Sequence, residues 1–277
     1  MLSIPFADLA FLAAALVAAG AATGLLAGVF GVGGGAVIVP ILYWCFGFLG
    51  VPDDIRMPLC VGTSLAVIIP TSIRSFNAHR AKGAADTSIV RAWAVPVVLG
   101  VLVGSLIARY APAGVFKGVF AGVAFVSAIR LLFGRDSWRL PGELKPGPLM
   151  TVYGLGIGVL STLMGIGGGQ LSNLFMTLYG RPIHQAVATS AGLGVLISIP
   201  GALGAVYAGW PQMGRLPPLS IGYVSLIAFA LMVPMSMWTA PIGARLAHSL
   251  SKRRLELAFG IFLLLVSMRF LASLFGY

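Results

Sequence analysis

Charged residues are scarce in this chain of 277 residues. Asp, Glu, Lys and Arg make up 9% of it, only seven residues are carboxylates, and hydrophobic residues make up 58%. A chain so poor in charge, without a long polar segment, has no room for a separate soluble domain. Apolar stretches of about 20 residues recur along its length, enough to cross a hydrocarbon core ~30 Å thick. We therefore expect an all-α polytopic membrane protein.

Histidine is also rare. The three histidines, His79, His184 and His248, lie near the ends of apolar stretches. An intramembrane enzyme needs a nucleophile beside a base, but Ser64 and His79 would be about 22 Å apart on one helix. His184 and Ser190, six residues apart, point to different helix faces. No H-E-x-x-H zinc motif occurs, so we expect no enzyme, no metal and no cofactor.

Glycine, by contrast, is abundant, and it is concentrated in two clusters 134 residues apart. The first reads GLLAGVFGVGGG over Gly24–Gly35, and the second reads GVLSTLMGIGGG over Gly158–Gly169. Glycine runs break helices, and lipid cannot satisfy the exposed backbone groups, so each break must face protein or a watery cavity. Interrupted helices at matching positions of two halves are typical of a transporter's binding site.

The likeness between the two halves extends beyond the glycines. VGTS at Val61–Ser64 matches VATS at Val187–Ser190, and Arg130 matches Arg269. We expect a first transmembrane repeat over 1–134, a polar linker with Pro and Gly over 135–148, and a second transmembrane repeat over 149–277. Each repeat has about five apolar segments and a helix break at its glycine cluster. The expected segments are 7–30, 34–49, 59–80, 88–110, 114–134, 149–166, 168–180, 183–208, 219–246 and 254–275.

The positive charges predict how the halves are oriented. The net charge of +11 indicates cytoplasmic loops rather than a nucleic-acid partner, because Lys and Arg collect in such loops. If the segments around each glycine cluster both cross, or both enter and return, the halves are inverted and the basic residues divide 13 to 5. If each cluster lies within one long span, the halves are parallel and the division is 10 to 8. The sharper division favours inverted repeats with both termini outside. The thirteen are Arg74, Arg80, Lys82, Arg91, Arg130, Arg135, Arg139, Lys145, Arg181, Arg245, Lys252, Arg253 and Arg254, and the five are Arg56, Arg109, Lys117, Arg215 and Arg269.

Both halves carry G-x-G-G-G, followed by G-T-S or A-T-S and then by a proline. The stretches are GVFGVGGGAVIVPIL at Gly28–Leu42, GTSLAVIIPTS at Gly62–Ser72, MGIGGGQLSNLFM at Met164–Met176 and ATSAGLGVL at Ala188–Leu196. In these motifs the chain resembles the TauE/SafE family, the sulfite and organosulfonate exporters of bacteria. The likeness covers essentially the whole chain.

This resemblance implies a secondary transporter or permease of small anions, with sulfite, sulfonates or related sulfur compounds as candidate substrates. It also implies a multi-pass protein of the bacterial cytoplasmic (inner) membrane, whose partners are the lipid bilayer and the small anionic substrate. A passive anion channel of the same fold is the alternative. The oligomeric state, the direction of transport and a coupling ion stay open.

We expect the substrate near the bilayer midplane, between the two breaks. Each cluster would open a half-helix, whose first N–H groups lack intrahelical partners and carry a partial positive charge. Helix starts of this kind bind anions, and glycine lets the backbone approach the ligand. The alternative is close helix packing through small residues. The expected binding glycines are Gly33, Gly34, Gly35, Gly167, Gly168 and Gly169.

Two polar side chains make the duplicated site asymmetric. Gln170 and Asn173 follow the second cluster, where Ala36 and Val39 follow the first. Uncharged amides can hold sulfite or sulfonate oxygens, and we include both residues in the expected site. The alternative is that they form hydrogen bonds between helices.

Two hydroxyl pairs recur early in their segments, Thr63 with Ser64 and Thr189 with Ser190. Both pairs are expected to act as caps or to line a central cavity. The alternative is a bond from each hydroxyl to a carbonyl of its own helix, which is common for Ser and Thr in membrane helices. A proline downstream of each pair favours a kinked helix at the site.

Overall fold

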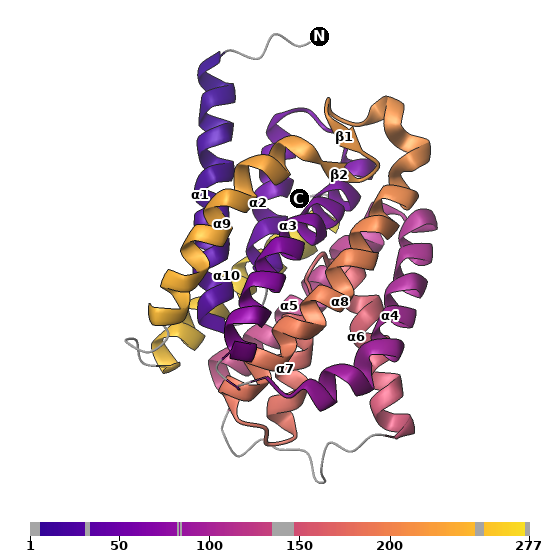
Figure 1. Cartoon of the computed structure of the whole chain (residues 1–277). Helices are drawn as coiled ribbons and strands as arrows, with labels where there is room; N and C mark the ends of the chain where they lie inside the picture. The colour runs from indigo at the N-terminus through magenta and orange to yellow at the C-terminus, as the bar shows by residue number, and fades with distance from the viewer. Residues whose placement is uncertain are drawn as a thin grey trace.

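The computed structural model describes residues 6–30, 34–81, 83, 85–134, 147–246 and 252–274. Within them the chain is almost entirely helical (Figure 1). Seven helices, α1, α3, α4, α5, α8, α9 and α10, contain a span long and apolar enough to cross a membrane. This confirms the expected all-α polytopic membrane protein. The helices are α1 (Phe6–Phe30), α2 (Gly35–Phe48), α3 (Asp53–Ala81), α4 (Thr87–Tyr110), α5 (Ala113–Phe133), α6 (Pro148–Met164), α7 (Gly169–Leu178), α8 (Ile183–Gly209), the 3₁₀ helix η1 (Trp210–Arg215), α9 (Leu226–Leu246) and α10 (Lys252–Leu274).

Each glycine cluster reverses the chain, so that α1 with α2 and α6 with α7 form helical hairpins. Gly34 lies against the side chain and carbonyl of Thr23 in the preceding helix. Gly168 likewise lies close to the Ser161 side chain in the helix before it. In continuous helices these pairs would be about 16 Å and 10 Å apart. With 14 and 10 residues, α2 and α7 are about 21 Å and 15 Å long, too short to cross a core of ~30 Å. The chain therefore does not continue as one long span through either cluster, which was the premise of the parallel arrangement.

Helices α3 and α8 run antiparallel through the middle of the bundle (Figure 1). Gly201 packs on Leu65 and Gly194 packs on Ser72, so residue numbers fall along α8 as they rise along α3. Corresponding segments of two inverted repeats would run in opposite directions, as these two helices do. The duplication itself stays a prediction, and this packing agrees with its inverted form.

Glycines bring α1 alongside α9 and α6 alongside α4, each pair parallel. On α1, Gly20 lies against Met232 and Gly24 lies against Ser236. Small residues let membrane helices approach closely, so these glycines of the first cluster region serve packing. The contacts of α6 with α4 are Gly154 with Pro96 and Gly158 with Val101.

The basic residues that the structure describes gather at two ends of the bundle. At one end, Arg130 donates to the carbonyl of Leu174, and Arg181 lies 3.9 Å from the carboxylate of Asp86. At the opposite end, Lys117 Nζ lies 2.7 Å from the Asp53 carboxylate, and Arg215 contacts Asp54 at 2.8 Å. Arg130 and Arg181 belong to the thirteen basic residues expected on one side of the membrane, and Lys117 and Arg215 belong to the five expected on the other. Their positions at opposite ends of the bundle are those that the inverted arrangement requires.

One expected segment, 219–246, is not a single helix. Its first residues form the two-stranded hairpin of β1 (Ser220–Ile221) and β2 (Val224–Ser225), and α9 starts only at Leu226. Gly222 has a φ of 52° in the turn, a conformation that glycine adopts without steric cost. The expected linker over 135–148 falls mostly outside the described residues.

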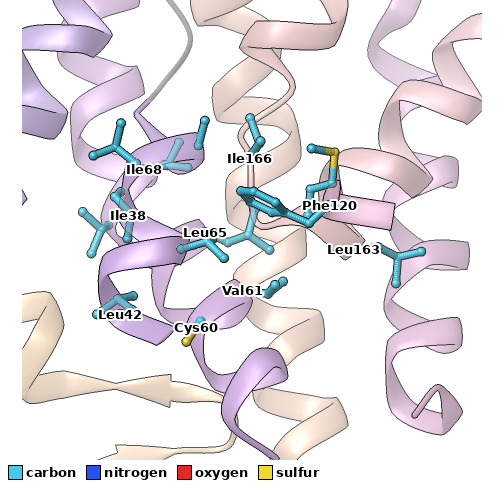
Figure 2. Packing of buried hydrophobic residues seen from close by; sticks show 14 of the residues in the cluster. Ile38, Leu42, Cys60, Val61, Leu65, Ile68, Phe120, Leu163 and Ile166 are labelled. Atoms are coloured by element: carbon cyan, nitrogen blue, oxygen red, sulfur yellow. The ribbon is translucent and has the colours of Figure 1, made fainter. Parts of the chain in front are cut away.

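The buried core lies where the tips of the hairpins meet α3. Figure 2 shows Ile38 of α2, Leu65 and Ile68 of α3, and Ile166 of the α6–α7 turn gathered there. Each of these side chains is at most 1% exposed. They form a continuous apolar layer behind the two glycine breaks.

Candidate functional site

Glycines in the left-handed conformation precede both half-helices. Gly34 and Gly168 come directly before α2 and α7, with φ of 72° and 69°. Residues with a Cβ rarely adopt this conformation. A Cβ at Gly34 would overlap the Thr23 side chain, and one at Gly168 would overlap Ile197. Both the turn and the packing therefore require glycine at these two positions.

The tips of the two hairpins touch. A Cβ on Gly35 would lie 2.5 Å from the carbonyl oxygen of Gly165 and 3.0 Å from Ile68 Cδ1. A Cβ on Gly167 would lie 2.6 Å from Ile68 Cγ2. The structure therefore brings the two breaks to one place, with the Ile68 side chain between them. Gly33, which also belongs to the predicted site, lies outside the described residues.

A small cavity lies beside the second break, with room for about one water molecule. Its walls come from α1, from the C-terminal half of α3, from the start of α7 and from α8. None of the lining residues carries a charge. They are Ala27, Thr71, Ser72, Ser75, Gly167, Gly169, Ser190, Ala191 and Gly194.

Four residues with hydroxyl side chains contribute to the wall of this cavity, whose exposed surface is mostly apolar, and only Ser190 among them belongs to the predicted site. The other three are Thr71, Ser72 and Ser75 of α3. They follow Pro70 in the sequence at a spacing that places them on one side of a helix, but this spacing does not show that the side lines a cavity. Thr71 Oγ1 donates to the Ile68 carbonyl at 2.9 Å, and Ser190 Oγ donates to the carbonyl of Val187, also at 2.9 Å.

Gln170 lies in the first turn of α7, next to the cavity-lining Gly169, and is 7% exposed. Among the residues that the structure describes, no group bonds to either Nε2 or Oε1 of its amide. A buried polar group without a partner costs ~1–3 kcal/mol, so native proteins contain few of them. Helix side chains lean toward the N-terminus, which directs this amide toward the break. Asn173, also predicted, lies one turn further along α7 and is half-buried.

Thr63 and Thr189, which were expected to act as caps or to line the cavity, bond to backbone N–H groups at the starts of other helices. Thr63 Oγ1 accepts a hydrogen bond of 2.9 Å from the N–H of Ser225, directly before α9. Thr189 Oγ1 accepts one of 2.9 Å from the N–H of Asp86, directly before α4. Both threonines are fully buried. Their matching sequence positions thus correspond to matching contacts with the backbone.

Ser64 also binds backbone: its Oγ donates to the carbonyl of Gly165 at 2.6 Å. Gly165 ends α6 in the left-handed conformation, with φ 69°. This hydroxyl therefore fixes the turn of the second hairpin to α3 and does not bond to its own helix.

A second cavity of similar size lies toward the other end of α3. Along α3 it is lined by residues before Ile68, where the first cavity is lined by residues after it. The two cavities therefore follow one another along the α3–α8 pair, with Ile68 between them. Within the described part of the chain, Ser105 Oγ in this second cavity has no hydrogen-bond partner. Six residues of its wall are Val61, Leu65, Ser105, Thr162, Gly201 and Ala205.

Comparison with known proteins identifies relatives along nearly the whole chain. The family model described as sulfite exporter TauE/SafE matches residues 16–270. A probable membrane transporter protein of Haemophilus influenzae is 31% identical over 248 residues, which cover 90% of this chain and 94% of the relative. One of Methanocaldococcus jannaschii is 27% identical over 270 residues, with the same shares covered. No solved structure matches the chain. The chain therefore belongs to the sulfite exporter TauE/SafE family and is a membrane transporter.

Proposed function

We propose that the protein transports small sulfur oxyanions, sulfite or organosulfonates, through the cavity beside the second glycine break. The observation that carries this proposal is that the N-terminus of a helix and several residues with hydroxyl side chains line the same cavity. Gly167 and Gly169, at the start of α7, line the same cavity as Thr71, Ser72 and Ser75. The family adds the substrate class, because its model is that of a sulfite exporter.

The chemistry of this wall suits an oxyanion. The first N–H groups of α7 have no partner within the helix and carry part of the positive end of the helix dipole. Glycines at 167 and 169 let a ligand reach those groups without a Cβ in the way. The hydroxyls of Ser72 and Ser75 and the amide of Gln170 would supply further donors for the remaining oxygens.

The arrangement favours a carrier over a permanently open channel. Ile68, part of the buried apolar core, lies along α3 between the residues that line the two cavities. Neither cavity has room for a sulfite ion in this conformation. Passage therefore requires the walls to move, and a site that opens to one side at a time accounts for two narrow cavities on either side of one layer. A passive channel is the second candidate.

We further propose that the protein acts without catalysis, in the cytoplasmic (inner) membrane of a bacterium. The end of the bundle that carries Arg130, Arg181 and Arg253 would face the cytoplasm, since Lys and Arg collect on that side. Both termini would then be outside. An anion leaving a negative interior gains about 2.3 kcal/mol per charge per 100 mV, so export would need no coupling ion.

Flux in proteoliposomes tests the function. Purified protein is reconstituted, and uptake of labelled sulfite and methanesulfonate is measured with and without unlabelled substrate inside. A carrier takes up label faster when unlabelled substrate is present inside, whereas a channel does not. Uptake that equals that of protein-free liposomes for both substrates would contradict the proposal. Uptake without stimulation from the far side would favour the channel.

A further inference from the structure

We propose that this site takes singly charged oxyanions, hydrogen sulfite and organosulfonates, in preference to dianions such as sulfite and sulfate. The inference rests on the proposed function, because it names the charge of the substrate bound at the same cavity. It is carried by a wall without charged side chains, next to the start of α7.

The uncharged wall sets the cost of burying an ion. All nine lining residues are Gly, Ala, Ser or Thr. Without a countercharge, the free energy of transferring an ion from water into a protein interior rises with the square of its charge. Hydroxyl and backbone donors offset part of this cost for one negative charge. A second negative charge would need a buried cation, and the wall supplies none.

The start of α7 provides part of a unit of complementary charge. The N-terminus of a helix carries roughly half an elementary charge, and Gly167 and Gly169, at the start of α7, line the cavity. At the carboxyl end of α6 the Ser161 carbonyl accepts the Ile166 N–H at 3.1 Å, and the Gly165 carbonyl accepts from the Ser64 hydroxyl. By contrast, no acceptor among the described residues bonds to the N–H of Gly169.

Charged groups just outside the wall add no positive charge. Asp86 is joined through its N–H to Thr189, and its carboxylate lies 3.9 Å from Arg181, so this pair is close to neutral. Burial alone would raise the pKa of Asp86, but hydrogen bonds from Ser88 and the backbone, with the charge of Arg181, outweigh it and lower the pKa. Asp86 therefore stays ionised near neutral pH. Arg74 of α3 is exposed and does not line the cavity.

Three probes with different charges test this inference in proteoliposomes of the full-length protein. Methanesulfonate carries one charge at every pH used, sulfate carries two, and sulfite gains its second charge as the pH rises from weakly acidic to weakly alkaline. We expect methanesulfonate flux to stay nearly constant with pH and sulfate flux to be at least about tenfold slower. Sulfite flux at fixed total concentration should fall as the pH rises. Protein-free liposomes at each pH give the background.

The outcomes separate this inference from the proposed function. Sulfate flux equal to methanesulfonate flux would overturn the charge preference, and so would sulfite flux that rises with pH relative to methanesulfonate. In either case the protein would still transport sulfur oxyanions. Flux of all three probes at the background level, at every pH, would overturn the proposed function.

Discussion

Ser64 and Gly165, 101 residues apart, are joined by a buried hydrogen bond of 2.6 Å from the serine hydroxyl to the glycine carbonyl. Gly165 ends α6, so its carbonyl has no helical N–H to accept from. Ser64 lies near the middle of α3, the helix that passes both cavities. The bond therefore attaches the turn of the second hairpin to the helix that lines the proposed pathway.

We expect Ser64→Ala to destabilise the protein by about 1–3 kcal/mol, because the buried carbonyl of Gly165 loses its donor. Thermal unfolding in detergent measures the loss. Ser127→Ala is the matched control, since Ser127 is buried in α5 and its hydroxyl has no partner among the described residues. Equal melting temperatures for the two variants would contradict the role given to the Ser64 bond.

The two threonine contacts predict a matched pair of effects. Thr63→Val and Thr189→Val keep the side-chain shape but remove the acceptors of the Ser225 and Asp86 N–H groups. Each should cost about 1–2 kcal/mol, and the double variant should cost their sum, because the contacts lie far apart. Chemical or thermal unfolding of the three variants measures this. If Thr189→Val lowers substrate affinity and leaves stability unchanged, Thr189 binds substrate after all.

The sequence was most informative about the helices and the glycine breaks. Segments such as 88–110 and 183–208 match α4 and α8 within one residue, because length and hydropathy determine spans in a membrane. The breaks at Gly34 and Gly168 could be predicted because a left-handed residue needs glycine. The division of basic residues favoured a reversal of the chain at each break, but the contact between the two hairpin tips could not be predicted, since a glycine run permits many directions and only tertiary contacts select one.

The side chains around the site were harder to predict. Thr63 and Thr189 recur at matched positions, but a hydroxyl that accepts from a distant N–H has the same sequence pattern as one that faces a ligand. Ser72 and Ser75 have no such recurrence to mark them. Which hydroxyl faces a cavity depends on how α3 packs against α8, and residue spacing within one helix does not contain that information.

Gly168→Ala should reduce the amount of folded protein, whereas Gly122→Ala should not. At Gly168 an alanine would adopt a left-handed conformation, at a cost of about 1–2 kcal/mol, and its Cβ would overlap Ile197. At Gly122, in α5, a Cβ meets no atom within 4 Å, and alanine is the better helix former. Size-exclusion chromatography after detergent extraction compares the two. Normal yield and melting temperature for Gly168→Ala would show that the turn does not need its glycine.

Ile68→Ala should produce a leak of anions. Ile68 fills the space between the two breaks and separates the two cavities, so its truncation connects them. Ile38→Ala is the control, because Ile38 is equally buried in the same core and both variants should lose about 2–5 kcal/mol of stability. Only Ile68→Ala should show downhill flux that unlabelled substrate inside the liposomes does not stimulate. Stimulated flux of the normal kind in that variant would mean that Ile68 is not the barrier.

Gln170→Leu should weaken substrate binding while leaving the fold intact. The amide is buried without a partner among the described residues, so a hydrogen bond to an oxyanion would account for its presence, and its loss should cost about 1–2 kcal/mol. The dissociation constant for methanesulfonate would then rise about tenfold, while the melting temperature of the free protein stays the same or increases, because two unpaired polar atoms leave the core. Gln170→Glu, of the same shape, should abolish binding through the repulsion of like charges. Titration of both purified variants decides between the two roles. If Gln170→Leu binds as tightly as the original protein, the amide serves packing alone, and the donors of the site are the N–H groups of α7 and the hydroxyls of α3.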